Sequence, residues 1–206
     1  MIEQFTFESY IFSVFQKPKN DHMACGDSYW LKETDETMIG VIADGLGSGP
    51  AAQKASKAAI ETVKRLQDQP IKRIILEVNK DQSNYRGVVL SIIKYYKKTR
   101  KLEYCGVGNI RLKLVMSMTQ VIQPRSKNGF LSGRPIDLEV HELIVEPNAW
   151  LIMYSDGIDF HQRELFDLYE LFNSCTDEQI NTYFSSSDHA PLVNHDDLTI
   201  LIGKPH

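Results

Sequence analysis

The expected helices of this chain fall into two pairs, which are separated by runs of consecutive strands. Helical spacing of apolar residues predicts a first pair: one helix begins near Pro50, and the next runs from Ile71 to about Asp81. It predicts a second pair at Phe160 to Phe172 and Asp177 to Phe184. A doubly wound parallel sheet would alternate strand and helix throughout, and this chain does not. We therefore expect an α+β fold in which two antiparallel sheets pack together with helix pairs outside.

The expected strands are short and rich in apolar residues. Met38 to Ala43 is almost continuously apolar, as in a strand that is buried on both faces. The expected strands run over Phe5 to Phe15, Ser28 to Lys32, Thr37 to Ala43, Gly87 to Tyr96, Lys101 to Cys105, Arg111 to Met116, Gln120 to Gln123, Leu138 to Val145, Ala149 to Tyr154 and Leu198 to Ile202. Polar turns at Glu33 to Glu36 and Lys97 to Arg100 predict two hairpins.

Composition narrows the class of protein further. The 206 residues are 42% hydrophobic and 24% charged, which is typical of a globular protein, and we expect one domain over 1–206 with no sensor domain attached. A net charge of −4 argues against nucleic acid as the partner, because proteins that bind the phosphate backbone carry a basic excess. No run of about 18 apolar residues is present, so we expect no membrane span. Three cysteines and no signal peptide favour a reducing, cytoplasmic location.

The informative residues are aspartates beside glycines at the ends of expected strands. Asp27 follows Gly26, Asp44 precedes Gly45, and Asp156 precedes Gly157. Asp196 and Asp197 lie together just before the last strand. Carboxylates gathered at one edge of a core would repel one another, so they are typical of a site for hard divalent cations, which prefer oxygen ligands. A glycine beside such a ligand lets a backbone carbonyl approach the metal.

Taken alone, each motif has a plainer interpretation. An Asp-Gly pair such as Asp156-Gly157 is most often a turn. The glycine-rich loop from Gly45 to Gly49 follows a buried strand and opens a helix, as a dinucleotide-binding loop would. Its glycine spacing is wrong for that role, and Asp44 would lie against the pyrophosphate.

In combination and in this order, the motifs resemble the metal-dependent serine/threonine phosphatases of the PPM (protein phosphatase 2C) family. The resemblance covers nearly the whole chain and is greatest to the bacterial SpoIIE-type branch. Within that branch it points to the RsbX-type serine phosphatases of the sigma-B stress pathway. The residues that carry it are Gly26-Asp27, Ala43-Asp44-Gly45-Leu46-Gly47-Ser48-Gly49, Gly106-Val107-Gly108-Asn109, Gly129-Phe130-Leu131-Ser132-Gly133-Arg134-Pro135, Ser155-Asp156-Gly157 and Asp196-Asp197-Leu198-Thr199.

The resemblance implies an α-β-β-α sandwich and a centre for two Mn²⁺ or Mg²⁺ ions. Asp44 would bridge the ions, and the Gly45 carbonyl and Asp27 would serve the second ion. Asp156 would hold the first ion together with Asp196, although the residues alone leave Asp197 open as the ligand. Asp44 and Asp156 are thus the expected catalytic residues. The implied reaction is hydrolysis of protein phosphoserine or phosphothreonine by a metal-activated water, without a cysteine or serine nucleophile.

The sequence departs from the family pattern at several positions. Gly26 stands where many relatives have Glu, and Leu46 stands where eukaryotic relatives have a His that is proposed as the acid. His195 is a candidate substitute for that acid, with a plain loop histidine as the other interpretation. An arginine that contacts phosphate in relatives would fall near His22, and its role could pass to His22, Lys19 or Arg134, or to no residue. Asn109 is expected to be a structural group or a neighbour of a ligand.

The expected partner follows from the resemblance alone. An RsbX-type enzyme would act on phosphorylated STAS-domain proteins of a stress-signalling complex. The basic segment from Tyr95 to Lys101 is either a solvated hairpin tip or a docking site for an acidic partner. The alternative function is an inactive phosphatase fold that serves as a binding module, but such a module would usually have lost one or more of the metal aspartates.

Overall fold

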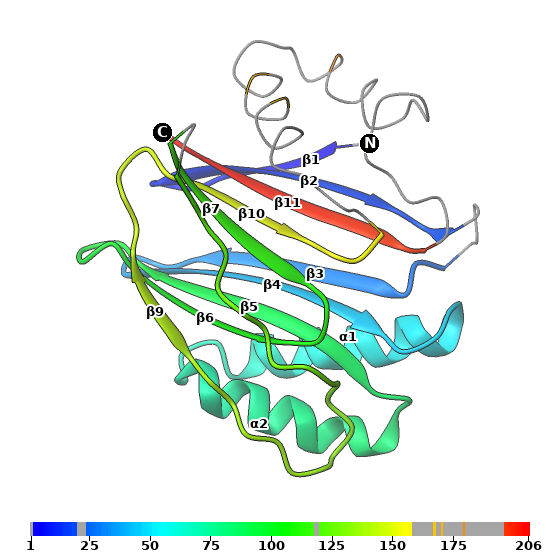
Figure 1. Cartoon of the computed structure of the whole chain (residues 1–206). Coiled ribbons are helices and arrows are strands. Elements are labelled where there is room, and N and C mark those ends of the chain that lie inside the picture. Colours follow the sequence, from blue (N-terminus) through cyan, green and yellow to red (C-terminus); the bar gives the residue numbers. More distant parts are fainter. Residues whose placement is uncertain are drawn as a thin grey trace.

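The computed structural model describes residues 2–19, 24–117, 120–157 and 196–206, together with Asp167, Glu170 and Gln179. Its described elements form three layers (Figure 1). One six-stranded sheet lies on a five-stranded sheet, and two helices cover the outer face of the five-stranded sheet. All strand pairs within both sheets are antiparallel, so the predicted pair of stacked antiparallel sheets is confirmed.

Sheet 1, the six-stranded sheet, has the order β1-β2-β11-β10-β7-β8. Its strands are β1 (Ile2–Thr6), β2 (Tyr10–Lys17), β7 (Arg111–Ser117), β8 (Gln120–Ile122), β10 (Trp150–Tyr154) and β11 (Leu198–Pro205). The last strand therefore lies between β2 and β10, at the centre of the sheet. This order places the ends of β10 and β11 side by side, with Tyr154 opposite Ile200.

Sheet 2, the five-stranded sheet, has the order β3-β4-β5-β6-β9. Its strands are β3 (Asp27–Glu33), β4 (Thr37–Gly45), β5 (Val88–Tyr96), β6 (Lys101–Val107) and β9 (His141–Ile144). The two hairpins predicted from polar turns, β3-β4 and β5-β6, are both present.

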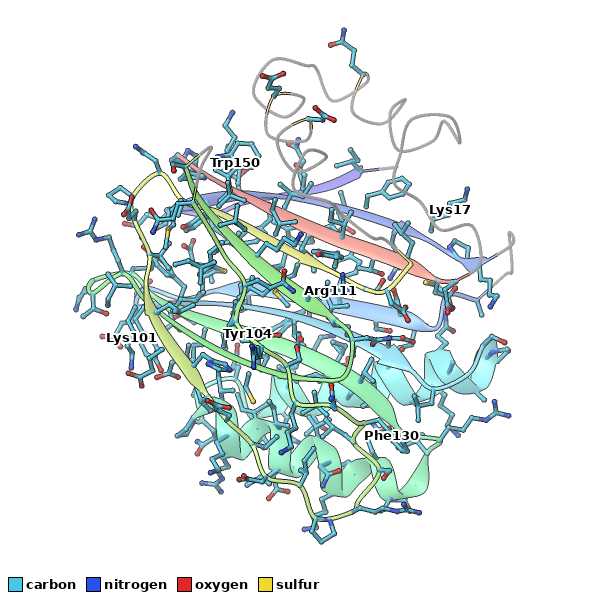
Figure 2. All side chains as sticks on the ribbon, in the orientation of Figure 1. Lys17, Lys101, Tyr104, Arg111, Phe130 and Trp150 are labelled. Carbon is cyan, nitrogen blue, oxygen red and sulfur yellow. The ribbon has the colours of Figure 1, made fainter. Side chains whose placement is uncertain are left out.

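β4 explains why an almost continuous apolar run is needed in this fold. Met38 and Ile42 face the layer between the two sheets, where they join one buried apolar cluster. Ile39, Val41 and Ala43 alternate with them and join a second cluster, beneath the helices. Both faces of sheet 2 are therefore covered, as the apolar run predicts. Figure 2 shows the side chains that fill the space between the sheets.

The helices are α1 (Pro50–Arg65) and α2 (Ile71–Asp81), followed by the short 3₁₀ turn η2 (Gln82–Asn84). Pro50 opens α1 because proline has the backbone angle of a first helical turn and needs no amide partner there. Ala52, Ala55 and Ala59 are fully buried, so these small side chains let α1 lie close to sheet 2. The predicted first helix pair is confirmed. The predicted second pair, at 160–172 and 177–184, lies outside the described residues.

Two strand predictions were wrong. Phe5 to Phe15 is not one strand but the hairpin β1-β2, in which the Phe7 N–H donates to the Tyr10 carbonyl at 2.9 Å. The apolar alternation continues on both sides of this tight turn, which concealed the turn. The strand expected from Leu138 to Val145 is confined to β9 (His141–Ile144), because Leu138 and Val140 pack against the apolar cluster beneath the helices and not within the sheet.

The basic hairpin tip is neutralised by its own neighbours. Lys97 Nζ lies 2.6 Å from Glu8 and 3.5 Å from Glu33, and Lys98 pairs with Glu36. The solvated-tip interpretation is therefore favoured over a docking site for an acidic partner. Within the described part of the chain, no helix is long and apolar enough to cross a membrane.

Candidate metal centre

Asp27 and Asp44 lie directly opposite each other at the end of the β3-β4 hairpin. Directly opposed residues on neighbouring strands project to the same face, with Cβ atoms about 5 Å apart. Asp44 is two residues beyond Ile42, so strand alternation points both carboxylates toward the space between the sheets. The hairpin register alone thus brings together two of the predicted ligands.

Sheet 1 contributes Ser155, which joins this pair from across the sandwich. The Ser155 hydroxyl donates to Asp27 Oδ2 at 2.8 Å and accepts from the Thr199 N–H at 2.9 Å. The other carboxylate oxygen of Asp27, Oδ1, is buried and has no hydrogen-bond partner within the described ranges. A buried carboxylate oxygen without a donor is costly unless a cation or proton serves it.

The two aspartates before β11 have different surroundings. Asp197 is buried, and its two oxygens accept hydrogen bonds from the Lys19 and Gly26 N–H groups, each at 2.8 Å. Asp196 is exposed, and its Oδ1 accepts the N–H of Asp197 at 2.9 Å. Asp197 therefore ties together the loops around the site, while the Asp196 carboxylate lies at the rim.

Asp156 lies at the exposed end of the segment that follows β10. The Asn109 side-chain amide donates to its Oδ2 at 2.6 Å, so Asn109 orients this carboxylate as a direct neighbour. The positively charged side chains of Arg111 and Lys19 both act on the Asp156 carboxylate, and their charges oppose the rise of its pKa. Lys19 Nζ also lies 4.0 Å from Asp196 Oδ1.

The electrostatics show that these carboxyls form one cluster. Burial, together with the charges of Asp27, Asp156, Asp196 and Asp197, raises the pKa of Asp44 to about 8. Burial likewise raises the pKa of Asp27 to about 7, against hydrogen bonds that lower it. The pKa of Asp156 is raised by burial first and by Asp196 second. At neutral pH such a cluster needs either protons or cations for its full stability.

Glycines allow the close approaches on which the site depends. A Cβ on Gly45 would lie 2.0 Å from the Ala52 carbonyl oxygen, so only glycine lets β4 meet the first turns of α1. A Cβ on Gly26 would lie 2.7 Å from Asp197 Oδ2, and one on Gly157 would lie 2.4 Å from the Asp197 carbonyl oxygen. The glycines beside the aspartates are therefore required by packing.

The donor set fits divalent cations of the hard class, because it consists of carboxylates with adjacent backbone carbonyls. The unpartnered Asp27 oxygen and the raised carboxyl pKa values support that fit. Within the described ranges, no three acidic, histidine or cysteine side chains converge into a ready-made cage. Water and backbone oxygens would have to complete the coordination, as is usual for Mg²⁺.

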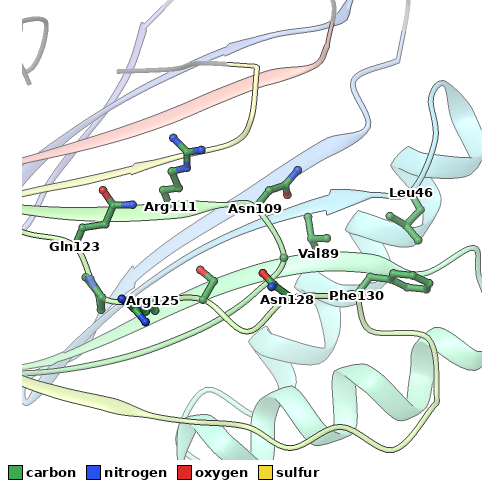
Figure 3. A pocket seen from close by; sticks show the side chains of 12 residues that line it. Leu46, Val89, Asn109, Arg111, Gln123, Arg125, Asn128 and Phe130 are labelled. Carbon is green, nitrogen blue, oxygen red and sulfur yellow. The ribbon is translucent and has the colours of Figure 1, made fainter. Parts of the chain in front are cut away.

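A cavity of about 750 Å³ lies beside the site, and its wall includes Leu46 and Asn109, the residue that donates to Asp156 (Figure 3). This cavity could not be predicted from the residues alone, because much of its lining comes from the irregular segment 123–130. Leu46 is partly buried in its wall and offers no acidic proton.

The remaining candidates can be placed only in part. His22 and His195 lie outside the described residues. The backbone carbonyl of Arg134 accepts a 2.7 Å hydrogen bond from the Asn79 side chain of α2, and Arg134 does not line the cavity. Burial raises the pKa of the Cys25 thiol, so Cys25 is unsuited to act as a thiolate nucleophile. β4 lies between antiparallel neighbours, which rules out the parallel sheet of a dinucleotide-binding fold.

The fold and the carboxylates at its edge define a phosphatase domain of the protein phosphatase 2C type. The sequence matches the Stage II sporulation protein E (SpoIIE) family over residues 34–205. The chain belongs to this family, as the resemblance predicted.

Comparison with known proteins identifies similar relatives. The chain is 31% identical over 196 residues to phosphoserine phosphatase RsbX of Bacillus subtilis (strain 168), covering 93% of this chain and 92% of that protein. A crystal structure of RsbX in complex with magnesium superposes with a TM-score of 0.84 at 30% identity, covering all of both chains.

More distant structures share the fold. A structure described as part of the bacterial stressosome, a modular system adapted to control secondary messenger signalling, has a TM-score of 0.82 at 20% identity, with coverage of 94% of this chain and 98% of that one. The PP2C phosphatase domain of SpoIIE from Bacillus subtilis has a TM-score of 0.71 at 18% identity, with coverage of 100% and 70%. These likenesses confirm the expected α-β-β-α type of fold.

Proposed function

We propose that this protein is a metal-dependent phosphatase that hydrolyses phosphoserine and phosphothreonine in proteins. The observation that carries the proposal is the buried pair Asp27 and Asp44, which have raised pKa values and an unpartnered oxygen. A protein gains nothing in stability from such a pair without a cation, so the pair argues for a functional site. The similarity to a phosphoserine phosphatase, which has a structure in complex with magnesium, supports the same reaction and the same class of ion.

Each carboxylate has a proposed role in holding two Mn²⁺ or Mg²⁺ ions. Asp44 would bridge them, and the Gly45 carbonyl and Asp27 would serve one ion. Asp156 and Asp196 would hold the other. Asp196 is preferred to Asp197 because both oxygens of Asp197 are engaged by backbone N–H groups. When bound, the ions would activate a water for attack on phosphorus and offset the charge of the phosphoryl oxygens.

The chain's own residues would prepare the site for this chemistry. Ser155 and Asn109 fix the orientations of Asp27 and Asp156 through hydrogen bonds of 2.8 and 2.6 Å. Asp197 holds the Gly26 backbone next to Asp27. Arg111 and Lys19 place positive charge beside Asp156, where a phosphate group would enter. These contacts hold the ligands in place before substrate binds, which is how such sites lower the activation barrier.

The substrate proposed here follows from the similarity to RsbX. We expect phosphorylated STAS-domain regulators of a bacterial stress-signalling pathway, in the cytoplasm, to be the natural substrates. Proteins of this kind would present a phosphoserine on a surface segment, which suits an open site at a sheet edge. We propose that residues 1–206 act as one catalytic domain.

The test is phosphate release from a phosphoserine peptide in Mn²⁺ by the wild type and by Asp44→Asn. Loss of the bridging carboxylate should lower the rate about 100-fold or more while the variant stays folded, as its circular dichroism spectrum would show. Asp35→Asn, in the exposed β3-β4 turn, is the matched control and should keep the wild-type rate. Undiminished turnover by Asp44→Asn would refute the bridging role. Calorimetric Mn²⁺ binding without turnover of any substrate would favour the alternative, a binding module.

A further inference from the structure

Two residues that line the cavity also adjoin the proposed catalytic site. Asn109 lines the cavity and donates to Asp156. Leu46 lines it and directly follows Gly45 at the end of β4. A phosphate group held at the carboxylates would therefore leave the rest of its segment facing this cavity.

The cavity is chemically polarised. Arg111 and Arg125 lie toward one side of it, whereas Leu46, Val89 and Phe130 lie toward the other (Figure 3). Arg111 lies opposite Tyr154 in the β7-β10 register, and Tyr154 is two residues before Asp156. Arg111 is therefore nearer the carboxylates along the sheet than Arg125. Local positive charge of this kind is notable in a chain whose net charge is −4.

Phe130 forms an exposed apolar surface at the other side. Its side chain is 45% exposed, one of three large apolar side chains so exposed in the described part of the chain. The ring packs near Gly87, where a Cβ would meet Phe130 Cδ2 at 3.0 Å and Leu46 Cδ1 at 3.1 Å. Phe130 and Leu46 thus form one apolar wall, built on a glycine that leaves room for both.

The segment that carries these residues is held firmly at both ends. The Lys127 N–H donates to Gly106, and the Lys127 carbonyl accepts from Gly108, each at 2.8 Å. Leu131 exchanges two backbone hydrogen bonds with Val88. Such anchors position a recognition surface before a partner arrives, which lowers the entropy cost of binding.

Buried Asn79 of α2 fixes the chain just beyond this segment. Its side-chain oxygen accepts from Ser132 and Gly133 at 3.0 and 3.1 Å, and its amide donates to the Arg134 carbonyl. The segment that carries the apolar wall is therefore attached to α2 through Asn79.

We propose that this cavity is the recognition groove for the segment of substrate protein on either side of the phosphoserine. An acidic side chain on one side would meet Arg125, and an apolar side chain on the other side would pack against Phe130 and Leu46. The volume of about 750 Å³ lies within the range of pockets that bury a drug-sized ligand, which leaves room for the side chains that flank a phosphoserine. This assignment rests on the proposed function and adds the sequence preference of that same site.

The test compares kcat/KM for synthetic phosphoserine peptides in Mn²⁺. One pair of peptides carries Asp on one flank of the phosphoserine and Leu on the other, in both orders, because a peptide can lie along the groove in either direction. A second pair replaces Asp with Lys, and a third replaces Leu with Ser. The wild type should prefer Asp over Lys about threefold to fivefold in one of the orders, as expected for an exposed ion pair.

Arg125→Ala should reduce that preference for Asp to nearly one. Arg125 itself is anchored through its backbone carbonyl, which accepts from His141 at 3.0 Å, so removal of its side chain leaves that anchor intact. Arg73→Ala is the matched control, because Arg73 is exposed on α2 and its guanidinium bonds Gln69. It should keep the wild-type preference. Phe130→Ala, with Phe130→Leu as the milder variant, should reduce the preference for Leu over Ser.

The outcomes separate the two proposals. If the wild type hydrolyses all the peptides with equal kcat/KM, or if Arg125→Ala and Phe130→Ala keep the wild-type preferences, the groove assignment is overturned while the phosphatase stands. If the wild type hydrolyses neither the peptides nor p-nitrophenyl phosphate, the proposed function fails and the groove assignment falls with it.

Discussion

Replacement of Asp27 with Asn tests whether the buried carboxylate lowers the stability of the metal-free protein. Asn has nearly the same shape and can still accept the Ser155 hydroxyl hydrogen bond. It removes the charge that burial disfavours, and it removes a proposed metal ligand. The variant should therefore behave in opposite ways with and without metal.

The magnitude follows from the pKa of Asp27, which is about 7 in the folded protein and about 4 in an unfolded chain. The folded state holds a proton that the unfolded state has lost between these values, so stability from this group is greatest below pH 4 and is lost as the pH rises to 7. Above pH 7 the ionised carboxylate lowers the free energy of unfolding by about 4 kcal/mol relative to a neutral side chain. The buried amide of Asn carries its own cost of about 1–3 kcal/mol, which does not depend on pH.

The assay is urea unfolding of both proteins in EDTA from pH 5 to pH 8. The difference in unfolding free energy should move in favour of Asp27→Asn by about 3 kcal/mol across that range. In excess Mn²⁺ the order should reverse, because the wild type retains the ligand. A difference that stays constant with pH in EDTA would refute the reasoning, since it would mean that Asp27 carries no burial penalty.

Three further predictions concern packing and metal binding. Gly45→Ala should lower the unfolding free energy by about 3 kcal/mol, because the new Cβ would meet the Ala52 carbonyl oxygen at 2.0 Å; thermal denaturation checks it, and an unchanged melting temperature would contradict it. Asn79→Ala should cost about 2–3 kcal/mol by leaving three backbone groups without their partner, and amide exchange of Ser132 and Gly133 should quicken. Mn²⁺ should raise the melting temperature with dose, because binding adds about 2.7 kcal/mol to the unfolding free energy at 100 times its dissociation constant. A flat response at millimolar Mn²⁺ would count against the site.

Much of the fold could be predicted because its strands are bounded by strong turn signals. The turn at Glu33 to Glu36 and the turn at Lys97 to Arg100 each joined a correctly predicted hairpin. The β1-β2 hairpin was missed because its turn contains no Gly, Pro or Asn. A signal was present nonetheless: Phe5 and Phe7 pack on the core, but on β2 the core residues are Tyr10, Phe12 and Val14. That shift from odd to even positions marks the turn.

The candidate site was predictable only where chemistry and local sequence coincide. Aspartates beside glycines identified the carboxylates, but their pairing is a matter of register: the β3-β4 hairpin places Asp27 opposite Asp44. The different surroundings of Asp196 and Asp197 depend on hydrogen bonds from Lys19 and Gly26, which lie far away in sequence.

The groove beside the carboxylates could not be predicted at all. Arg125 and Phe130 lie in an irregular segment without periodicity. Its position is set by Asn79 and by backbone contacts with β5 and β6. Such long-range contacts leave no pattern in one sequence.

Hydrolysis of p-nitrophenyl phosphate tests whether the carboxylates form a metal-dependent phosphatase site, in three reactions: the wild type with Mn²⁺, the wild type with EDTA, and Asp156→Asn with Mn²⁺. Asp156 is exposed and accepts one hydrogen bond from Asn109, so its isosteric replacement should preserve the fold. We expect hydrolysis by the wild type with Mn²⁺ and almost none in the other two reactions. Equal hydrolysis in EDTA, or by Asp156→Asn, would contradict a metal-dependent phosphatase site at this edge of the sandwich.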